Sequence, residues 1–565
     1  MRNKLIIVFI FFNIICIYFS KNVNAKYVYT NKENIFKIQS ADNTFPEING
    51  RNYDVYDESF NDNITVNFSD NLGIKYSKYW FKEDNNVFSE NDDGTSFENG
   101  FVFEKSGYYK IEVCDLYDNK IQYTFLIDEE VNKSEINLIY EDDNQVILSN
   151  NVADFVSGIY KSEVYKDGNL IKTYDYSIND TKEVFEEFVI DKTDINFYEE
   201  IYVINYDKIG NTQKTNSIFL NQDKIYDLDD LFRFNNIVNN KIDDFSGKNV
   251  YLMNNLDMSL ESNRVWNSII DFKGEFDGKN HTISGFYMDT SSEKSGFFAS
   301  NYGKIKDFTV IGEIKSNANI SAGICGENFG EIYNCRSKVT INSTGDYAGG
   351  IAGINHGTIE LCKNNFDITI DGICAGGIVG YNKNIGIIRK NGSSGKITGN
   401  QFVGGICGFT EGNESNAVIE QCFNMGTIKA NSYVGGICGA AFGKTNMNYL
   451  YNRGDVIELN NSGNNGGIVG DHNTNISVRN SYNLGNINSL ISNQIAHQNV
   501  SVSDSYYVLG RNNNSGNGIG KDEYLFKELI LNTESILSLL SENTNNIWSI
   551  KYGYNDGYPL FVWQL

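Results

Sequence analysis

The sequence predicts an all-β protein with two β-sandwich modules followed by a parallel β-helix with helical caps. Three observations lead to this fold class. A short glycine-rich phrase returns at a nearly constant spacing, and runs of alternating polar and apolar residues precede it. The chain of 565 residues also contains 52 glycines but only 2 prolines. A fixed period of this size is typical of repeats that stack because none can bury its apolar face alone.

Residues 1–25 are typical of a secretory signal peptide. Arg2 and Lys4 give a positive start, an apolar run extends over Leu5–Phe19, and small residues end the segment at Ala25. The run is short for a membrane span, although an uncleaved anchor is the alternative. We therefore expect a secreted or cell-surface protein with no membrane span in the mature chain.

Residues 26–128 have the pattern of a half-buried antiparallel sheet. Polar and apolar residues alternate in 63–68, 107–113 and 122–127, with turn residues between these segments. About 100 residues of this kind suffice for one β-sandwich. The run that begins Gly107-Tyr-Tyr-Lys-Ile-Glu-Val resembles the Ig-like modules of bacterial surface proteins.

A second module of the same type is expected over residues 129–222. Its phrase Asp207-Lys-Ile-Gly-Asn211 is typical of a turn with a residue at positive φ before a last strand. Such a phrase could also bind calcium through carboxylate and carbonyl oxygens. The turn is preferred, because no acidic cluster at defined spacing accompanies the phrase. No metal site is predicted.

Residues 223–510 are expected to form the β-helix. Its capping helix lies at 227–240, where apolar residues recur at helical spacing behind Asp227, a good N-cap. A solenoid end exposes unpaired backbone, so it needs a cover. With the Phe-Asp-Gly turn at 276–278, this succession resembles the start of secreted β-helices.

The phrase Gly-Gly-Ile-x-Gly defines the coils. It occurs at 349–353, 376–380, 404–408, 435–439 and 466–470, with looser copies at 295–297 and 321–326. Aligned glycines are separated by 27, 27, 27, 28, 31 and 31 residues. Three apolar columns follow, predicting seven or eight coils: Phe297, Ile324, Ile351, Ile378, Ile406, Ile437 and Ile468; Ile305, Ile332, Ile359, Ile388, Ile419 and Val478; Ile314, Ile341, Ile370, Ile397, Ile428, Val456 and Ile487.

These repeats resemble the GLUG motif of bacterial surface proteins. That motif joins Gly-Gly-Ile-x-Gly to Ile-x-x-Cys-x-Asn-x-Gly, and residues 419–426 match the second part in full. The resemblance covers about 227–487. In each phrase the residue after the isoleucine is also small and apolar, so either the strand bends there or that face is covered.

Residues 511–565 are expected to form a C-terminal cap. Helical patterns occupy 522–530 and 534–540, and an aromatic strand segment occupies 548–563. A ligand platform is the alternative.

The formal charge of -25 disfavours nucleic acid and anionic lipid as partners, since both need basic patches. Of 9 cysteines, eight remain after signal removal, and they are expected to be small apolar residues stacked along the coils. Disulfides Cys335–Cys362 and Cys407–Cys438, each one coil apart, are the alternative, favoured by secretion. No Cys-x-x-Cys occurs, which disfavours zinc.

Catalytic patterns are missing from the sequence. The four histidines (His281, His356, His472 and His497) form no His-Glu-x-x-His motif, and no Gly-x-Ser-x-Gly elbow occurs. The outward polar residues Asp346, Asp371, Glu360, Glu420 and Arg389 are not expected to recur on one column or to cluster, so no catalytic residue, cofactor site or metal site is predicted. The alternative is a polysaccharide lyase or glycoside hydrolase on the β-helix.

The predicted function is therefore a non-catalytic interaction or adhesion role. The partner would be a host or cell-surface protein or a glycan. The segments 410–416 and 439–449 lengthen their coils beyond 27 residues, and they are the expected binding places. The Gly-Gly-Ile phrase itself is expected to be scaffold, with the ligand held elsewhere.

Overall fold

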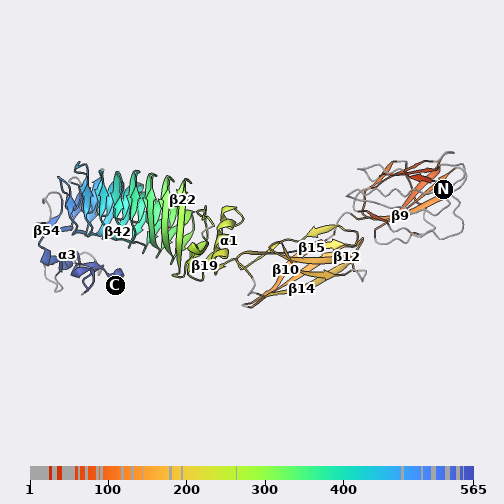
Figure 1. Cartoon of the computed structure of the whole chain (residues 1–565), viewed down its shortest axis with the longest axis horizontal. Helices are drawn as coiled ribbons and strands as arrows, with labels where there is room; N and C mark the ends of the chain where they lie inside the picture. The colour runs from red at the N-terminus through yellow and green to blue at the C-terminus, as the bar shows by residue number, and fades with distance from the viewer. Residues whose placement is uncertain are drawn as a thin grey trace. The chain divides into compact units, whose positions relative to one another are not determined.

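The computed structural model describes residues 74–565 and four earlier strands. The earlier strands are 25–27, 35–40, 58–60 and 64–69; the gaps after residue 74 are 84–87, 89–92, 99, 116–119, 129–130, 132, 143, 177–180, 192–194, 262–263, 473–475, 498–499, 511–516, 528–534, 542–546 and 552. The chain divides into two compact units, residues 1–195 with 199–220, and residues 196–198 with 221–565 (Figure 1). The predicted signal peptide lies outside the described residues except for Ala25.

The first sheets lie where the first sandwich was predicted. One contains β1 (Ala25–Tyr27), β2 (Ile35–Ser40), β4 (Ile64–Ser69) and β7 (Phe101–Phe103); the other contains β3 (Glu58–Phe60), β9 (Lys120–Ile127), β8 (Gly107–Asp115), β5 (Ile74–Lys82) and β6 (Thr95–Ser96). Aromatic residues dominate the buried cluster, which includes Phe97, Phe103, Tyr109 and Phe125.

Two further sheets follow. The first contains β10 (Lys133–Glu141), β11 (Gln145–Ala153) and β14 (Glu183–Asp191); the second contains β13 (Asn169–Asp175), β12 (Ile159–Lys166), β15 (Glu199–Asp207), β16 (Thr212–Lys214) and β17 (Ile218–Leu220). Alternate residues of facing strands share one core, for example Leu148 and Phe188 with Val164 and Val203. The two sheets therefore pack face to face.

Residues 224–507 form a parallel β-solenoid of about ten turns, which confirms the predicted fold class. The prediction of seven or eight coils was too low. The first coils, with β18 (Lys224–Ile225), β19 (Asn249–Leu252) and β20 (Leu256–Asp257), and the last, with β52 (Ser501–Ser503) and β53 (Tyr506–Val508), stack in parallel on their neighbours without carrying the Gly-Gly-Ile phrase. Counting copies of the Gly-Gly-Ile phrase therefore misses the coils at both ends of the solenoid.

Each full coil contributes strands to four stacked columns. A short-strand sheet contains β23 (Lys294–Ser295), β27 (Ile320–Ala322), β31 (Tyr347–Gly349), β36 (Cys374–Gly376), β41 (Phe402–Gly404), β44 (Val434–Gly435) and β47 (Asn465–Gly466). After the isoleucine come β24 (Phe298–Asn301), β28 (Cys325–Asn328), β32 (Ala352–Asn355), β37 (Val379–Lys383), β42 (Cys407–Asn424), β45 (Cys438–Asn452) and β48 (Val469–His472).

The other two columns complete each coil. One contains β21 (Glu275–Asp277), β25 (Lys304–Lys306), β29 (Glu331–Tyr333), β33 (Thr358–Glu360), β38 (Ile387–Arg389) and β49 (Ile476–Arg479). The last contains β22 (Thr282–Thr290), β26 (Thr309–Ser316), β30 (Arg336–Ser343), β34 (Lys363–Asn364), β35 (Ile368–Ile370), β39 (Gly392–Ser393), β40 (Ile397–Thr398), β43 (Ile428–Ala430), β46 (Val456–Glu458), β50 (Tyr482–Asn483) and β51 (Ile487–Asn488).

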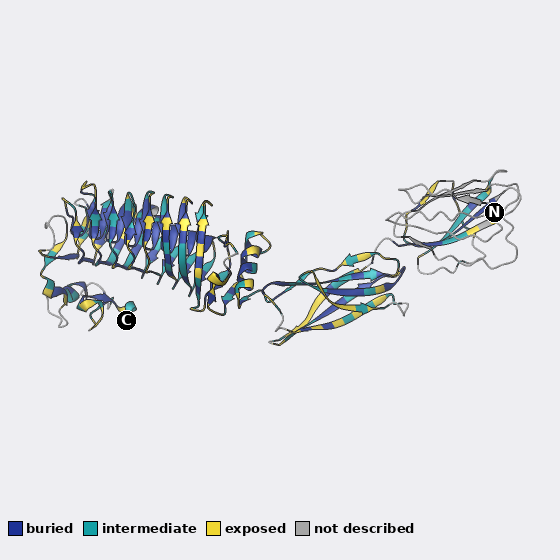
Figure 2. Ribbon diagram, viewed as in Figure 1, coloured by how far each residue is buried: buried dark blue, intermediate teal, exposed yellow. Residues whose placement is uncertain are grey.

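The predicted apolar columns are buried in the solenoid, and Figure 2 shows buried residues in dark blue along its strands. One position was wrong. Ile368, rather than Ile370, pairs with Ile341 on one side and Ile397 on the other, whereas Ile370 pairs with Ser343. Both isoleucines point inward and lie two residues apart, so sequence alone could not choose between these two registers.

The Gly-Gly-Ile phrase marks a bend. In one coil β31 ends at Gly349 and β32 begins at Ala352, so Gly350 and Ile351 form the corner. Both Ile351 and Ala352 are fully buried. The bend therefore explains why two successive apolar residues face the interior. A side chain at Gly350 would contact the Gly377 carbonyl and the Asn364 side chain, so only glycine fits this corner.

Buried asparagines form ladders along two other corners. Asn301, Asn328 and Asn355 each donate a side-chain N–H to the amide oxygen of the next asparagine, at 2.8 Å, and the ladder reaches Asn382. A second ladder joins Asn424, Asn452 and Asn483 at 2.9 Å. Each ladder fixes the register of neighbouring coils, because amide groups on successive coils must lie directly above one another.

The eight described cysteines are buried, and none of them forms a disulfide with another described cysteine. Each of the three in the second half of the motif (Cys335, Cys362 and Cys422) donates its S–H to the carbonyl two residues earlier, at 3.4, 3.3 and 3.2 Å. Cys407 and Cys438 stack in register without a bond between their sulfurs. These thiols behave as small apolar residues with one weak donor.

Helix α1 (Leu228–Asn239) confirms the predicted capping helix. The side chain of Asp227 accepts a hydrogen bond from the Asp230 backbone N–H, which satisfies one free donor of the first turn. Phe234 packs against Phe272 and Phe276 of the first coils, with ring centroids 5.7 and 5.9 Å apart. The helix thus covers the first open end of the solenoid.

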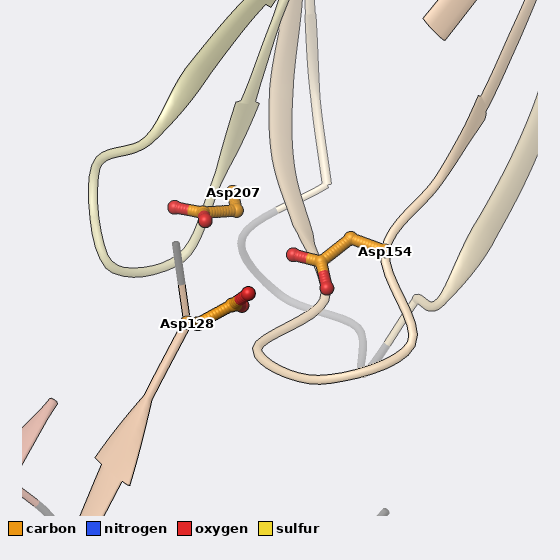
Figure 3. A group of neighbouring side chains, drawn as sticks. All are labelled: Asp128, Asp154 and Asp207. Atoms are coloured by element: carbon orange, nitrogen blue, oxygen red, sulfur yellow. The ribbon is translucent and has the colours of Figure 1, made fainter. Parts of the chain in front are cut away.

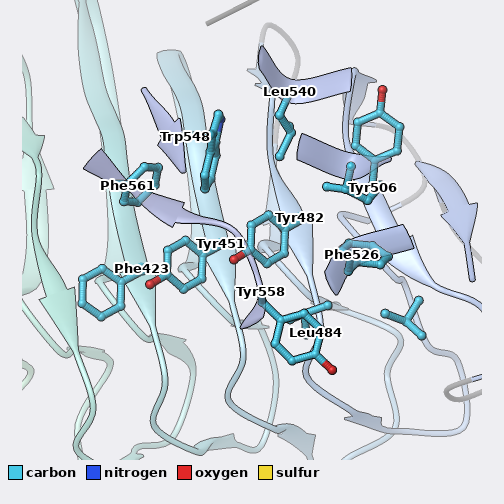
Figure 4. Packing of buried hydrophobic residues seen from close by; sticks show 12 residues of the cluster. Phe423, Tyr451, Tyr482, Leu484, Tyr506, Phe526, Leu540, Trp548, Tyr558 and Phe561 are labelled. Atoms are coloured by element: carbon cyan, nitrogen blue, oxygen red, sulfur yellow. The ribbon is translucent and has the colours of Figure 1, made fainter. Parts of the chain in front are cut away.

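The C-terminal segment packs on the side of the last coils. It contains β54 (Ile519–Lys521), α2 (Glu523–Lys527), α3 (Ile536–Ser541), the antiparallel pair β55 (Trp548–Ser549) and β56 (Leu560–Phe561), and short 3-10 turns η3 (Asn555–Gly557) and η4 (Val562–Gln564). Phe423, Tyr451 and Tyr482 stack on successive coils and are covered by Trp548 and Phe561 (Figure 4). The C-terminal segment therefore forms a cap over these rings.

No helix in the described part of the chain is long and apolar enough to cross a membrane.

Candidate functional site

An aromatic strip lies along one side of the β-helix. It consists of six half-buried side chains, Tyr347, Tyr381, Phe402, Phe409, Tyr433 and Phe442. Neighbouring rings are in contact: Tyr347 and Tyr381 stack at 5.7 Å, Phe409 lies 5.1 Å from Tyr381 and 5.1 Å from Phe402, and Phe402 lies 4.9 Å from Tyr433. Phe442 contacts Phe409 edge-on at 5.1 Å. The rings therefore form one continuous surface.

The strip follows from stacking. Tyr347, Phe402 and Tyr433 directly precede the Ala/Val-Gly-Gly corner of their coils, whereas Tyr381 and Phe409 directly follow its last glycine. Phe402 contacts Tyr433 because β41 pairs with β44, and Tyr381 contacts Phe409 because β37 pairs with β42. The sequence signal for this strip is the set of aromatic residues on both sides of the Gly-Gly-Ile phrase. That phrase was expected to serve only as scaffold.

Polar groups border the strip. The Tyr381 hydroxyl donates to Glu411 at 2.6 Å, and Lys383 lies over the Tyr381 ring at 5.6 Å. Burial and this carboxylate raise the pKa of Tyr381 above its ordinary value. Toward the N-terminal end, Lys294 and Glu327 form an ion pair at 2.5 Å. The surface therefore combines ring faces with hydrogen-bonding groups.

The two segments expected to bind, 410–416 and 439–449, lie side by side. They belong to the long strands β42 and β45, which pair in parallel, with Glu411 opposite Phe442 and Gly412 opposite Gly443. Each contributes to the strip or its border. Whether they bind a ligand remains a prediction.

The expectation that the outward polar candidates share no column was wrong. Glu360, Arg389 and Glu420 occupy successive positions of one column, because β38 pairs with β33 on one side and β42 on the other. Arg389 donates to Glu360 at 2.8 Å, and Lys390 does so at 3.0 Å. Burial raises the pKa of Glu360, but these two cations outweigh it, so the net pKa is lowered. Asp346 and Asp371 lie outside this column.

The histidines do not come together around one centre in the described residues. His356 stacks on Phe329 at 4.6 Å, and its Nε2 lies 3.2 Å from Glu327. His497 lies 3.9 Å from Asp471. The His472 side chain lies outside the described residues.

An acidic cluster lies in the first compact unit, where the second module meets the end of β9. Oxygens of Asp128, Asp154 and Asp207 all fall within 4.8 Å of one another, and all three residues are buried (Figure 3). Asp128 follows β9, Asp154 follows β11, and Asp207 ends β15. From the sequence, a turn at Asp207 is preferred to a calcium site, because no acidic cluster is visible near it in the sequence. Sheet topology supplies that cluster from segments far apart in sequence.

No protein-family model matches the chain, and no curated protein matches it. Three solved structures show a weak likeness. A candidate immunoglobulin A1 protease from Bacteroides ovatus is 18% identical, with a TM-score of 0.33, covering 60% of this chain and 92% of its own. The pectate lyase Pel3 from Pectobacterium carotovorum is 10% identical, with a TM-score of 0.13, covering 57% and 85%. A family 28 exopolygalacturonase from Yersinia enterocolitica is 8% identical, with a TM-score of 0.20, covering 69% and 98%. Likenesses at this level carry no functional conclusion.

Proposed function

We propose that this chain is a secreted or cell-surface interaction protein that binds a glycan through the aromatic strip. A protein partner is the second candidate. The observation that carries the proposal is the strip itself: six contacting rings at the surface of the β-helix, bordered by Glu411 and Lys383. The acidic net charge of -25 argues against nucleic acid as the ligand.

The strip suits a carbohydrate for chemical reasons. A sugar ring has apolar C–H faces that pack on aromatic faces, while its hydroxyl groups need hydrogen-bond partners at the edges. Tyrosine serves both needs, since its ring is apolar and its hydroxyl is polar. A row of contacting rings along a solenoid offers such positions in sequence along one direction. A contiguous apolar surface that is partly open to solvent is typical of an interaction site.

A polysaccharide-active enzyme remains the alternative. Its best candidates are Glu360 and Glu420, which lie two coils apart on one column with Arg389 between them. A general acid needs a carboxyl with a raised pKa, whereas the pKa of Glu360 is lowered by its two cationic partners. This observation favours binding over catalysis.

The test is binding by variants of the strip. We expect the wild-type chain to bind members of a glycan array, and the double variant Phe402→Ala with Tyr433→Ala to bind at least about 10-fold more weakly, because each removes a stacked ring. Tyr287→Ala is the matched control, since Tyr287 is an exposed ring on β22 outside the strip.

Two results would contradict the proposal. Equal binding by wild type and the double variant would show that the strip is not part of the binding interface. Depolymerisation of a polysaccharide that Glu360→Gln abolishes would favour the enzymatic alternative.

A further inference from the structure

Three buried carboxylates meet in the first compact unit, where no described residue gives them a positively charged partner. Asp128, Asp154 and Asp207 are 1%, 0% and 1% exposed. None of the three forms an ion pair with a described residue; they accept only neutral donors. Burying charge in this way is costly unless something compensates it.

One carboxylate oxygen of the cluster accepts no hydrogen bond from the described residues. Asp128 Oδ2 accepts the Ser157 backbone N–H at 3.0 Å, but Asp128 Oδ1 is buried and has no hydrogen-bond partner among the described residues. Figure 3 shows the Asp128 carboxylate directed into the space between Asp154 and Asp207. A buried acceptor left unsatisfied at the centre of a cluster indicates that a ligand is missing from the set of contacts.

The surrounding turns hold the other two carboxylates in place. Asp154 accepts the Val156 N–H at 2.9 Å and the Ser157 hydroxyl at 2.8 Å. Asp207 Oδ1 accepts the backbone N–H groups of Gly210 and Asn211 at 2.7 and 2.8 Å. Asn211 also donates to the Asp128 carbonyl at 2.6 Å, which ties the third segment to the same turn.

We propose that Asp128, Asp154 and Asp207 form a binding site for a calcium ion. The donors are all oxygens, with no cysteine or histidine among them, so a hard cation fits and zinc does not. Calcium accepts six to eight oxygens in flexible geometry, which three carboxylates and nearby carbonyl oxygens can help supply. The Asp-x-x-Gly-Asn phrase is then both a turn and part of a metal site.

Electrostatics supports the same site. Burial and the neighbouring Asp154 carboxylate raise the pKa of Asp128 to about 7. Burial also raises the pKa of Asp207, although hydrogen bonds from Asn211 oppose it. The three buried carboxylates therefore oppose one another's ionisation, and a bound divalent cation would compensate their charge.

The consequence concerns the connection between modules. Asp128 immediately follows β9 and precedes β10, so it belongs to the segment that joins the first sheets to the second module. A calcium ion would cross-link this segment to the turns after β11 and β15. Calcium would therefore hold Asp128 to these two turns as well as stabilise the module.

The test uses the full chain, first treated with a chelator and then titrated with CaCl₂, MgCl₂ or ZnCl₂ by calorimetry at pH 8. We expect calcium to bind and to raise the first unit's unfolding temperature by about 5 °C or more. Asp128→Asn should weaken calcium binding at least about 30-fold. Without calcium the same variant should be more stable than wild type, because it removes an uncompensated charge.

Asp142→Asn is the matched control. Asp142 caps the turn between β10 and β11 by accepting the Asn144 and Gln145 N–H groups, and it lies outside the cluster. It should bind calcium as wild type does. No calcium binding at millimolar concentration, or equal binding by Asp128→Asn, would overturn the proposal, and the site would then be a set of carboxyls that share protons. Tighter binding of zinc than calcium would overturn the choice of metal.

Discussion

At the residue scale, Glu327 shows how an outward side chain of the β-helix is held. His356 lies 3.2 Å from its carboxylate and Lys294 lies 2.5 Å from it, each from a different coil. Hydrogen bonds from His356 and then Lys294 lower the pKa of Glu327 to about 2, despite its burial. The group thus joins three coils through its charge.

The Glu327 contacts predict a pH dependence. A folded pKa below the unfolded value gives stability that is present above about pH 4.5 and is lost as pH falls toward 2. Glu327→Gln should therefore lower the free energy of unfolding at pH 7 by about 1–2 kcal/mol and flatten its decline in acid. Chemical denaturation of the second unit at several pH values measures this, with Glu313→Gln, an exposed carboxylate paired loosely with Lys315 at 3.5 Å, as the control. Parallel acid profiles for Glu327→Gln and wild type would contradict it.

At the element scale, α1 protects the first coil. Its N-cap Asp227 satisfies a backbone donor, and its buried face packs on the first coils. A solenoid contacts only neighbouring repeats, so loosening of the cap should spread from that end.

Asp227→Ala should therefore destabilise the second unit by about 1 kcal/mol and increase hydrogen exchange most strongly in β19 and β21. Asp227→Asn keeps the capping oxygen and should resemble wild type. If exchange rises equally in the central coils and in β19, the cap does not act locally.

Sequence predicts elements well where one period dominates. The isoleucine columns and α1 could be found because their spacing follows from the coil and the helix alone. The choice of Ile370 over Ile368 failed because both face inward. The aromatic strip was missed because its rings meet only when coils stack, and the Asp128 cluster because three strand ends meet only through sheet topology. Both the aromatic strip and the Asp128 cluster are formed by contacts between segments far apart in the sequence. Local sequence patterns do not reveal such contacts.

At the scale of the whole molecule, the two compact units should unfold separately. Contacts are dense within each unit, and a multidomain chain of this kind does not unfold as a single two-state system. Calorimetry should show two transitions. Calcium should move only the transition of the unit that contains Asp128, and strip variants should alter only the other.

A single cooperative transition that moves as a whole with calcium would contradict this independence. Limited proteolysis near residue 221 provides a second measurement, since the chain passes from the first unit to the second there, although residues 196–198 also belong to the second unit. Separate fragments that each retain their transition would support it.

The asparagine ladders make one coil interchangeable with the next. Because Asn301, Asn328 and Asn355 repeat the same side-chain hydrogen bond from one coil to the next, these coils present the same corner to one another. A tandem duplication in the gene that copies one repeat would lengthen the solenoid by one strand spacing, about 4.8 Å, without a new kind of contact. Gene duplication can therefore lengthen the solenoid by one coil at a time while its cross-section stays the same.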